Sequence, residues 1–138
     1  MKLLSIISIL CVSTILIGTS CKKQKTDQVH NSPGVIRKVQ FILYTDKDFS
    51  SNSDIITFKL SIQNSTNQTL WDSMLTPMKI KDMPNVAHKL VVEKVVPGND
   101  ASRLKVGFYY SIENVGNSWH VDMFNAGETF KIVDFNFQ

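Results

Sequence analysis

Hydrophobic and polar residues alternate with a period of two through most of the chain from Val35 onward. The clearest example is the segment 56–62, where every second residue is apolar: Ile56, Phe58, Leu60 and Ile62. Successive side chains of a β-strand point to opposite faces of a sheet, so this pattern predicts a strand with one buried face. The segment 38–44 predicts an earlier strand of the same kind, with a buried face formed by Val39, Phe41 and Leu43.

Turn-forming residues separate further segments of this type. Residues 64–67 predict a turn into a hairpin partner over 68–75, and the β-branched residues of 89–96 predict another strand. Alternation over 104–112 predicts a strand whose buried face is formed by Leu104, Val106, Phe108, Tyr110 and Ile112. The segments 119–124 and 130–137 complete a meander. A change of phase in the last segment predicts a β-bulge near Ile132.

These segments together predict an all-β fold. About seven short strands with one apolar face each are typical of a two-sheet antiparallel β-sandwich, and a partly open barrel is the alternative. In architecture the chain resembles the immunoglobulin-like and transthyretin-like sandwiches found in small lipoproteins. The disulfide of immunoglobulin domains is excluded, because both cysteines, Cys11 and Cys21, precede the predicted strands. Such a fold predicts no function by itself.

The first 20 residues have the parts of a secretory signal peptide. Lys2 precedes an uncharged, mostly apolar run over residues 3–17, and the small residues Gly18, Thr19 and Ser20 follow it. A transmembrane helix needs about 20 apolar residues, so the length of this run favours a cleaved signal over an uncleaved anchor.

Cys21 directly follows these small residues, and its position indicates a specific type of signal peptide. Gly18-Thr19-Ser20-Cys21 resembles the lipobox of bacterial lipoproteins, and Ser-Cys-Lys-Lys is similar to its looser form in Bacteroidota. The resemblance implies cleavage before Cys21, diacylation of the Cys21 thiol and attachment to a membrane of the cell envelope, with the outer membrane expected. An ordinary secretory signal that is cut elsewhere is the alternative.

The polar segment 21–33 predicts a flexible tether. The expected organisation is therefore a signal peptide over 1–20, a lipidated tether over 21–33 and a β-sandwich domain over 34–138. The formal net charge of the chain is +3, and Lys22, Lys23 and Lys25 concentrate the basic excess in the tether, which favours contact with anionic headgroups. No basic run is interleaved with aromatic residues, so a nucleic-acid partner is not expected. Some Bacteroidota lipoproteins carry an acidic export signal after the cysteine, and lysines at this position favour a periplasm-facing leaflet over the cell surface.

The loop between the first two predicted strands is acidic. It offers the carboxylate and amide oxygens that calcium prefers, from Asp46, Asp48, Asn52 and Asp54. It does not match the helix–loop–helix calcium motif, because Ser51 replaces the glycine and Thr57 the bidentate acid. Two interpretations stay open: a calcium site formed by Asp46, Asp48 and Asp54, or a solvated loop rich in turn-forming residues, which we favour.

Aromatic side chains on an exposed face are candidates for a glycan-binding surface, because their rings stack on sugars. Tyr109 is in phase with polar residues of its strand and is expected to be exposed, whereas the side that Trp71 takes is undecided. Trp119 is in phase with Val121 and Met123, which predicts a buried position. Tyr109 and Trp71 are therefore the candidate ligand-binding residues, although a single exposed tyrosine is also ordinary protein surface.

Two short patterns add candidate sites. His120 and Asp122 share a face of a predicted strand, but no second histidine lies at ligand spacing, so we interpret them as surface residues rather than a metal site. Asp72-Ser73-Met74 resembles the short motif at which Bacteroidota O-glycosylate exported proteins. The resemblance implies Ser73 as the modified residue, provided that its side chain is exposed.

The chain contains no catalytic motif such as Gly-x-Ser-x-Gly, His-Glu-x-x-His or a glycine-rich phosphate loop. Asp46 and Asp48 lie on one loop rather than across a cleft, which does not suit glycoside hydrolysis. We therefore do not expect an enzyme. The sequence favours a lipid-anchored envelope protein that acts as a non-catalytic binding or assembly module, with a partner protein added to an edge strand. The alternative is a carbohydrate-binding accessory lipoprotein that uses exposed aromatic residues.

Overall fold

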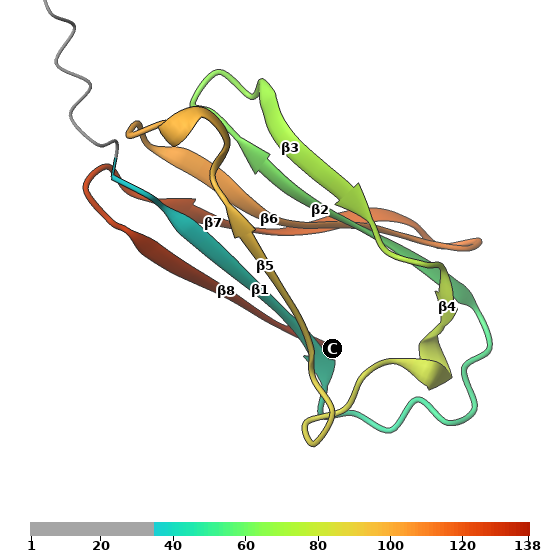
Figure 1. Cartoon of the computed structure of the whole chain (residues 1–138). Coiled ribbons are helices and arrows are strands. Elements are labelled where there is room, and N and C mark those ends of the chain that lie inside the picture. Colours follow the sequence, from blue (N-terminus) through green and yellow to red (C-terminus); the bar gives the residue numbers. More distant parts are fainter. Residues whose placement is uncertain (1–34) are drawn as a thin grey trace, which may run out of the picture. The chain divides into compact units, whose positions relative to one another are not determined.

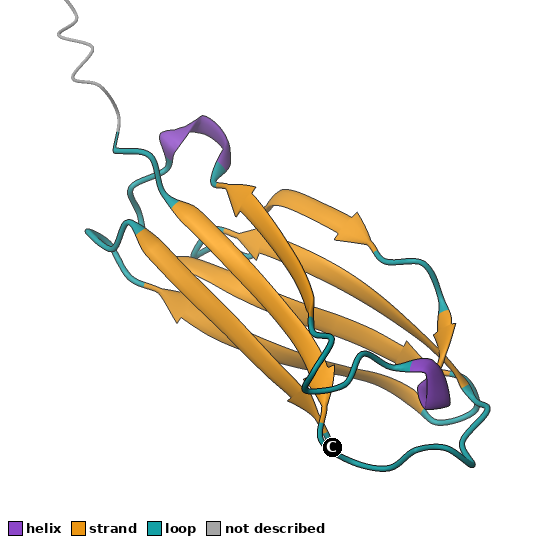
Figure 2. Cartoon of the chain, turned by 60° about the horizontal axis from the view of Figure 1, so that its bottom comes forward, coloured by secondary structure: helices purple, strands orange, loops and turns teal. Residues whose placement is uncertain are grey.

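The computed structural model describes residues 35–138, so the predicted signal peptide, Cys21 and the tether lie outside the described residues. Eight strands and two short 3-10 helices form this part of the chain. The strands are β1 (Lys38–Thr45), β2 (Ile55–Gln63), β3 (Thr69–Met74), β4 (Met78–Lys79), β5 (Leu90–Val95), β6 (Leu104–Ile112), β7 (Gly116–Phe124) and β8 (Phe130–Phe137). The helices are η1 (Ile80–Asp82) and η2 (Pro97–Asn99), and they lie at opposite ends of the strands (Figure 2). Neither helix is long and apolar enough to cross a membrane.

The strands form two sheets that pack face to face, which confirms the predicted all-β sandwich (Figure 1). Sheet A has the strand order β5–β1–β8, and sheet B has the order β3–β2–β6–β7, with the two-residue strand β4 paired to β2. One pair departs from the antiparallel expectation, because β1 and β8 run parallel along their whole length. In the constant-type immunoglobulin arrangement the first two strands share a sheet. Here β1 and β2 lie in different sheets, so the strand order is not of that type.

The predicted alternation places the core between the two sheets. Val39, Phe41 and Leu43 of β1 are buried, as are the inward residues of β2 and the first three of β6. The prediction of a buried position is wrong for Tyr110 and Ile112, which are half-buried where β6 approaches its end. Aromatic rings fill the centre, and many meet edge to face; Phe41 and Phe108, for example, have centroids 5.7 Å apart and planes at 86°. This geometry is the one that the ring quadrupoles favour. The domain is thus held together by an aromatic interior rather than by a disulfide.

The predicted β-bulge near Ile132 is wrong. β8 pairs with β1 in unbroken register from Phe130 to Phe137. Val133, Phe135 and Phe137 point into the core, whereas Phe130 and Ile132 lie on the outer face of sheet A and are 47% and 46% exposed. The apparent change of phase arises because the first half of this strand carries apolar residues on its outer face.

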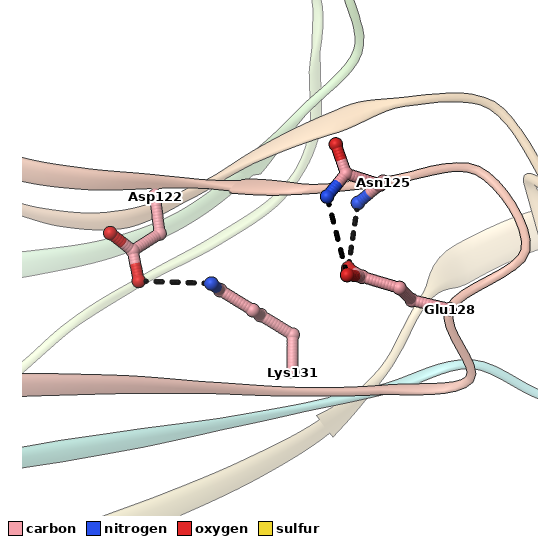
Figure 3. Close-up of polar contacts among 4 residues, drawn as sticks. All are labelled: Asp122, Asn125, Glu128 and Lys131. Atoms are coloured by element: carbon pink, nitrogen blue, oxygen red, sulfur yellow. Dashed lines mark hydrogen bonds and ion pairs between the residues drawn. The ribbon is translucent and has the colours of Figure 1, made fainter.

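Contacts between the sheets close both open sides of the sandwich. On one side, Lys131 of β8 forms an ion pair with Asp122 of β7, with an Nζ–Oδ2 distance of 3.2 Å (Figure 3). On the other side, the ring of Trp71 on β3 packs on Phe41, with centroids 6.0 Å apart, and the Nζ of Lys94 lies 5.1 Å from the Trp71 ring. Each side of the core is therefore covered by a long side chain of sheet A.

Arg37, directly before β1, is only 2% exposed. Its guanidinium donates hydrogen bonds to five backbone carbonyl oxygens, those of Asp100, Ser102, Phe124, Asn125 and Glu128. Burial lowers the pKa of Arg37, while the nearby carboxylates of Asp100 and Glu128 oppose this shift. The arginine thus joins the β5–β6 loop and the β7–β8 turn to the start of β1.

Candidate functional site

A pair of aromatic residues lies on the outer face of sheet B. Tyr109 of β6 and Trp119 of β7 are directly opposite each other in the antiparallel register, so their side chains share one face. Trp119 is 68% exposed, and Tyr109 is half-buried. The prediction that Trp119 belongs to the core is therefore wrong. Tyr109 lies on the outer face as expected, but it is half-buried rather than fully exposed. We refer to these two residues as the aromatic pair.

The position of Trp119 follows from the residues that β7 turns inward. Phe124 is fully buried, and residues in phase with it face the core. His120 stacks on Phe135, with ring centroids 4.7 Å apart and planes at 8°, and Asp122 reaches Lys131. The interpretation of His120 and Asp122 as outward surface residues is thus corrected, since both line the open side of the sandwich. β7 is an edge strand, where polar side chains can face inward and still reach solvent.

The aromatic pair belongs to a row that crosses all four main strands of sheet B. Met74 of β3 pairs with Lys59 of β2, Lys59 pairs with Tyr109, and Tyr109 pairs with Trp119. Met74 is 61% exposed, so the row is open to solvent at both ends. A ligand that lies on this face therefore meets an apolar thioether, an ammonium group and two aromatic rings in sequence.

Two grooves flank the aromatic pair, and Tyr109 and Trp119 line both of them. The first has a volume of about 350 Å³ and also contacts Thr57, Lys59, Met74, Tyr110, Asn117 and Ser118. The second has a volume of about 380 Å³ and also contacts Asn67, Lys105, Val121 and Met123. Both volumes fall in the range of about 300–1,000 Å³ that is typical of small-ligand sites. The aromatic pair thus forms a ridge between two grooves, each of which is large enough for a small ligand.

Polar contacts hold the side chains around this ridge. The hydroxyl of Tyr109 donates a hydrogen bond to Oε1 of Gln63 at 3.2 Å, and the Nζ of Lys59 lies 5.4 Å from the Tyr109 ring centroid. On the other side, the Nζ of Lys105 donates to Oδ1 of Asn67 at 2.6 Å. These contacts fix the phenol ring and one ammonium group before any ligand arrives, which lowers the entropy lost on binding.

The residues that line the grooves offer several kinds of contact to a ligand. They supply aromatic faces, ammonium groups, amides and hydroxyls, but no carboxylate, imidazole or thiol. Stacking and hydrogen-bond donation are what the grooves can provide.

Trp71, the other candidate from the sequence, is not part of this surface. Its ring is half-buried and packs on Phe41 at the opposite open side of the sandwich. Tyr109 and Trp71 therefore do not form one site. Ser73, two residues further along β3, is half-buried on the same side, whereas Asp72 and Met74 are exposed. O-glycosylation of Ser73 stays a prediction, and only part of its side chain is accessible.

Side-chain oxygens of the acidic loop accept hydrogen bonds within the loop and from Gln138. Asp48 accepts a hydrogen bond from the backbone N–H of Ser50, and Asn52 accepts one from the N–H of Asp54, as in Asx turns. A hydrogen bond from Ser50 lowers the pKa of Asp48. The pKa of Asp46 is also lowered, mainly by hydrogen bonding with the side chain of Asn136. In residues 35–138 no three His, Cys, Asp or Glu side chains lie close enough together to hold a metal ion.

Sequence reasoning found Tyr109 but missed Trp119, Lys59 and Lys105. The signal for Trp119 was present, because counting back from Phe124 in steps of two gives Asp122 and His120 and leaves Trp119 on the outer face. The outward positions of Lys59 and Lys105 could likewise be predicted from the alternation of their own strands. Comparison with protein-family models, with curated proteins and with solved structures found no match to this chain.

Proposed function

We propose that the protein is a lipid-anchored, non-catalytic binding module of a bacterial cell envelope and that it binds a glycan on the outer face of sheet B. The observation that carries the proposal is the aromatic pair between two grooves, in which Trp119 is exposed and Tyr109 is half-buried. A tryptophan that is two-thirds exposed on a sheet face keeps apolar ring surface in contact with water. A ligand that covers the ring removes this surface from water, which is favourable.

Several features of the site favour a sugar over a purely apolar ligand. Aromatic rings stack on the apolar faces of sugars, while sugar hydroxyls need hydrogen-bond partners around the ring. Asn67, Asn117 and Ser118 supply such partners at the edges of the two grooves. The site thus combines stacking surfaces with a polar rim, which also matches the general design of ligand sites in proteins.

A direct test is binding of the full-length protein, in detergent micelles, to an array of bacterial and plant polysaccharides. We expect Trp119→Ala to abolish glycan binding and Tyr109→Ala to weaken it strongly, because both remove a stacking face. Phe130→Ala is the matched control, since Phe130 is also exposed but lies on sheet A. Binding that survives Trp119→Ala, or no binding to any glycan, contradicts the proposal.

The lipid anchor rests on the lipobox resemblance at Cys21 and is tested separately. The wild-type protein is expected to partition into the detergent phase after expression in a bacterial host that processes lipoproteins. Cys21→Ser is expected to leave the protein uncleaved or to move it to the aqueous phase. If the variant is cleaved and partitions as the wild type does, the prediction of lipidation at Cys21 is wrong.

An assembly module is the second candidate, and the outer face of sheet A favours it. Val91, Val95, Phe130 and Ile132 on this face are each about half exposed. An envelope protein that covers this face or extends an edge strand would bury these residues. Cross-linking in native cells followed by mass spectrometry distinguishes the two functions: a single dominant protein partner favours assembly, and recovery with polysaccharide alone favours glycan binding.

A further inference from the structure

We infer that the ligand on sheet B is an acidic oligosaccharide whose negative groups are bound by Lys59 and Lys105. The inference rests on the proposed function, because it names the class of glycan that the same site accepts. The inference is based on the charged residues that line the two grooves. This observation is independent of the aromatic pair.

Both grooves are positively charged and lack a negative group. Lys59 lines the first groove and Lys105 the second, and no Asp or Glu lines either of them. Neither lysine forms an ion pair with a carboxylate of residues 35–138, where Lys131 and Asp122 form the one ion pair. Asp72 lies on the same face, but on the edge strand β3 and outside both grooves. The site therefore presents two uncompensated positive charges beside the aromatic pair.

Both lysines are also held by contacts on the face of sheet B. Lys59 and Lys105 are both half-buried. Lys105 is held in place by its hydrogen bond to Asn67, and Lys59 lies over the ring of Tyr109. An ammonium group that is already positioned loses less conformational entropy when it binds an anion than a freely moving one does.

The spacing of the lysines indicates an extended ligand. Lys59 is directly opposite Tyr109, and Lys105 precedes Tyr109 by four residues on β6. At about 3.3 Å per residue, the backbone positions that carry the two charges are about 13 Å apart along the strands. The Tyr109–Trp119 ridge lies beside this path. This spacing fits an oligosaccharide that stacks on the ridge and carries acidic groups on both sides of it.

The experiment measures the affinity of the full-length protein in detergent micelles by calorimetry. The probes are oligosaccharides of polygalacturonate, alginate and heparin, each compared with its neutral counterpart. The first two are carboxyl-reduced, and heparin is desulfated, N-acetylated and carboxyl-reduced. We expect at least one acidic probe to bind about tenfold more tightly than its neutral form. We expect the difference to shrink when NaCl is raised from about 0.15 M to about 0.5 M, because salt screens the charges.

Variants assign the effect to the two lysines. Lys59→Gln and Lys105→Gln are each expected to weaken binding of the acidic probe roughly twofold to fivefold, and the double variant is expected to remove the preference over the neutral form. The matched control is Lys47→Gln combined with Lys81→Gln. It changes the net charge equally, but both residues are exposed and lie outside the grooves.

The outcomes separate this inference from the proposed function. Equal affinity for acidic and neutral forms, with binding still lost in Trp119→Ala, overturns the acidic ligand and leaves the glycan site standing. Equal loss of binding in the control variant also overturns the inference, because the effect is then one of net charge. If polyglutamate binds as tightly with the same dependence on Lys59 and Lys105, the ligand is an acidic protein. If no glycan binds, the proposed function fails and this inference fails with it.

Discussion

The guanidinium of Arg37 stacks on the ring of Phe124, with its Cζ 3.9 Å from the ring centroid. Phe124 is the last residue of β7 and is fully buried. The stack therefore joins the end of β7 in sheet B to the start of β1 in sheet A. The same guanidinium hydrogen-bonds to carbonyl oxygens of the β5–β6 loop and the β7–β8 turn. A buried cation is costly unless its donors are satisfied, and here the backbone satisfies them.

Arg37→Ala is expected to lower the free energy of unfolding by about 3 kcal/mol or more, because it leaves buried carbonyl oxygens without donors. Arg37→Lys should recover only part of this loss, since an ammonium group has three donors and no planar fork. Urea unfolding followed by circular dichroism measures both. The control is Arg103→Ala, at an exposed arginine, and an equal effect of Arg37→Ala and Arg103→Ala would show that the carbonyl cluster contributes nothing.

Local alternation was sufficient to predict the strands and most of their buried faces. Residues 56–62 of β2 and 104–108 of β6 have the predicted buried sets, because these segments lie at the centre of sheet B and are covered by sheet A. Tyr110 and Ile112, further along β6, are only half-buried. The first half of β8 misled the prediction, since Phe130 and Ile132 are apolar residues on an outer face. Periodicity reports which residues share a face, but not which of two apolar faces is covered.

The candidate site was harder to predict than the fold. Trp119 lies on an edge strand, where the inward face carries His120 and Asp122 and the outward face is the more apolar one. Arg37 gave no signal at all, because its partners are backbone carbonyls of segments more than 60 residues away along the chain. The parallel pairing of β1 with β8 is equally non-local. Such features depend on the tertiary arrangement and cannot be read from neighbouring residues.

Gly107→Ala is expected to destabilise the domain by about 2–3 kcal/mol, because the new methyl group has no space. A Cβ at this position would overlap the carbonyl oxygen of His120 and would lie 2.7 Å from the Cα of Val121. Both are backbone atoms, so β7 would have to move away from β6. Thermal unfolding measures the loss, and Ser111→Ala, at an exposed position of the same strand, is the control. Because β7 carries Trp119, the variant should also weaken glycan binding; a variant as stable as the wild type would contradict the close approach.

Ser61→Ala is expected to raise the free energy of unfolding by about 1 kcal/mol. The Oγ of Ser61 is buried and has no hydrogen-bond partner in the described part of the chain, and the side chain is only 1% exposed. Removing the hydroxyl removes the cost of its desolvation and leaves a methyl group of nearly the same size. Urea unfolding provides the measurement, with Ser118→Ala at an exposed position as the control. A loss of stability in Ser61→Ala would mean that the hydroxyl has a partner after all.

Glu128 gives a prediction for the dependence of stability on pH. Its carboxylate accepts hydrogen bonds from the backbone N–H of Asn125 at 2.8 Å and from the Asn125 side-chain amide at 3.2 Å (Figure 3). The backbone hydrogen bond is the main cause of the lowered pKa of Glu128 in the folded protein. The unfolded chain therefore binds a proton more readily than the folded one. The stabilisation from Glu128 is thus present above the unfolded pKa of about 4.3 and is lost as the pH falls through the lower folded value.

Glu128→Gln removes this titration, so the variant is expected to be less stable than the wild type at pH 7. The difference should disappear at a pH below the folded pKa, where the wild-type carboxyl is also neutral. Urea midpoints measured from about pH 7 down to about pH 2.5 follow the change, and the wild-type curve should fall more steeply than that of the variant. The control is Glu113→Gln, because the exposed Glu113 side chain forms no hydrogen bond or ion pair with residues 35–138. A difference between wild type and Glu128→Gln that persists unchanged at the lowest pH would mean that the carboxylate charge does not stabilise the turn. The β7–β8 turn would then be held by the backbone and Arg37 alone.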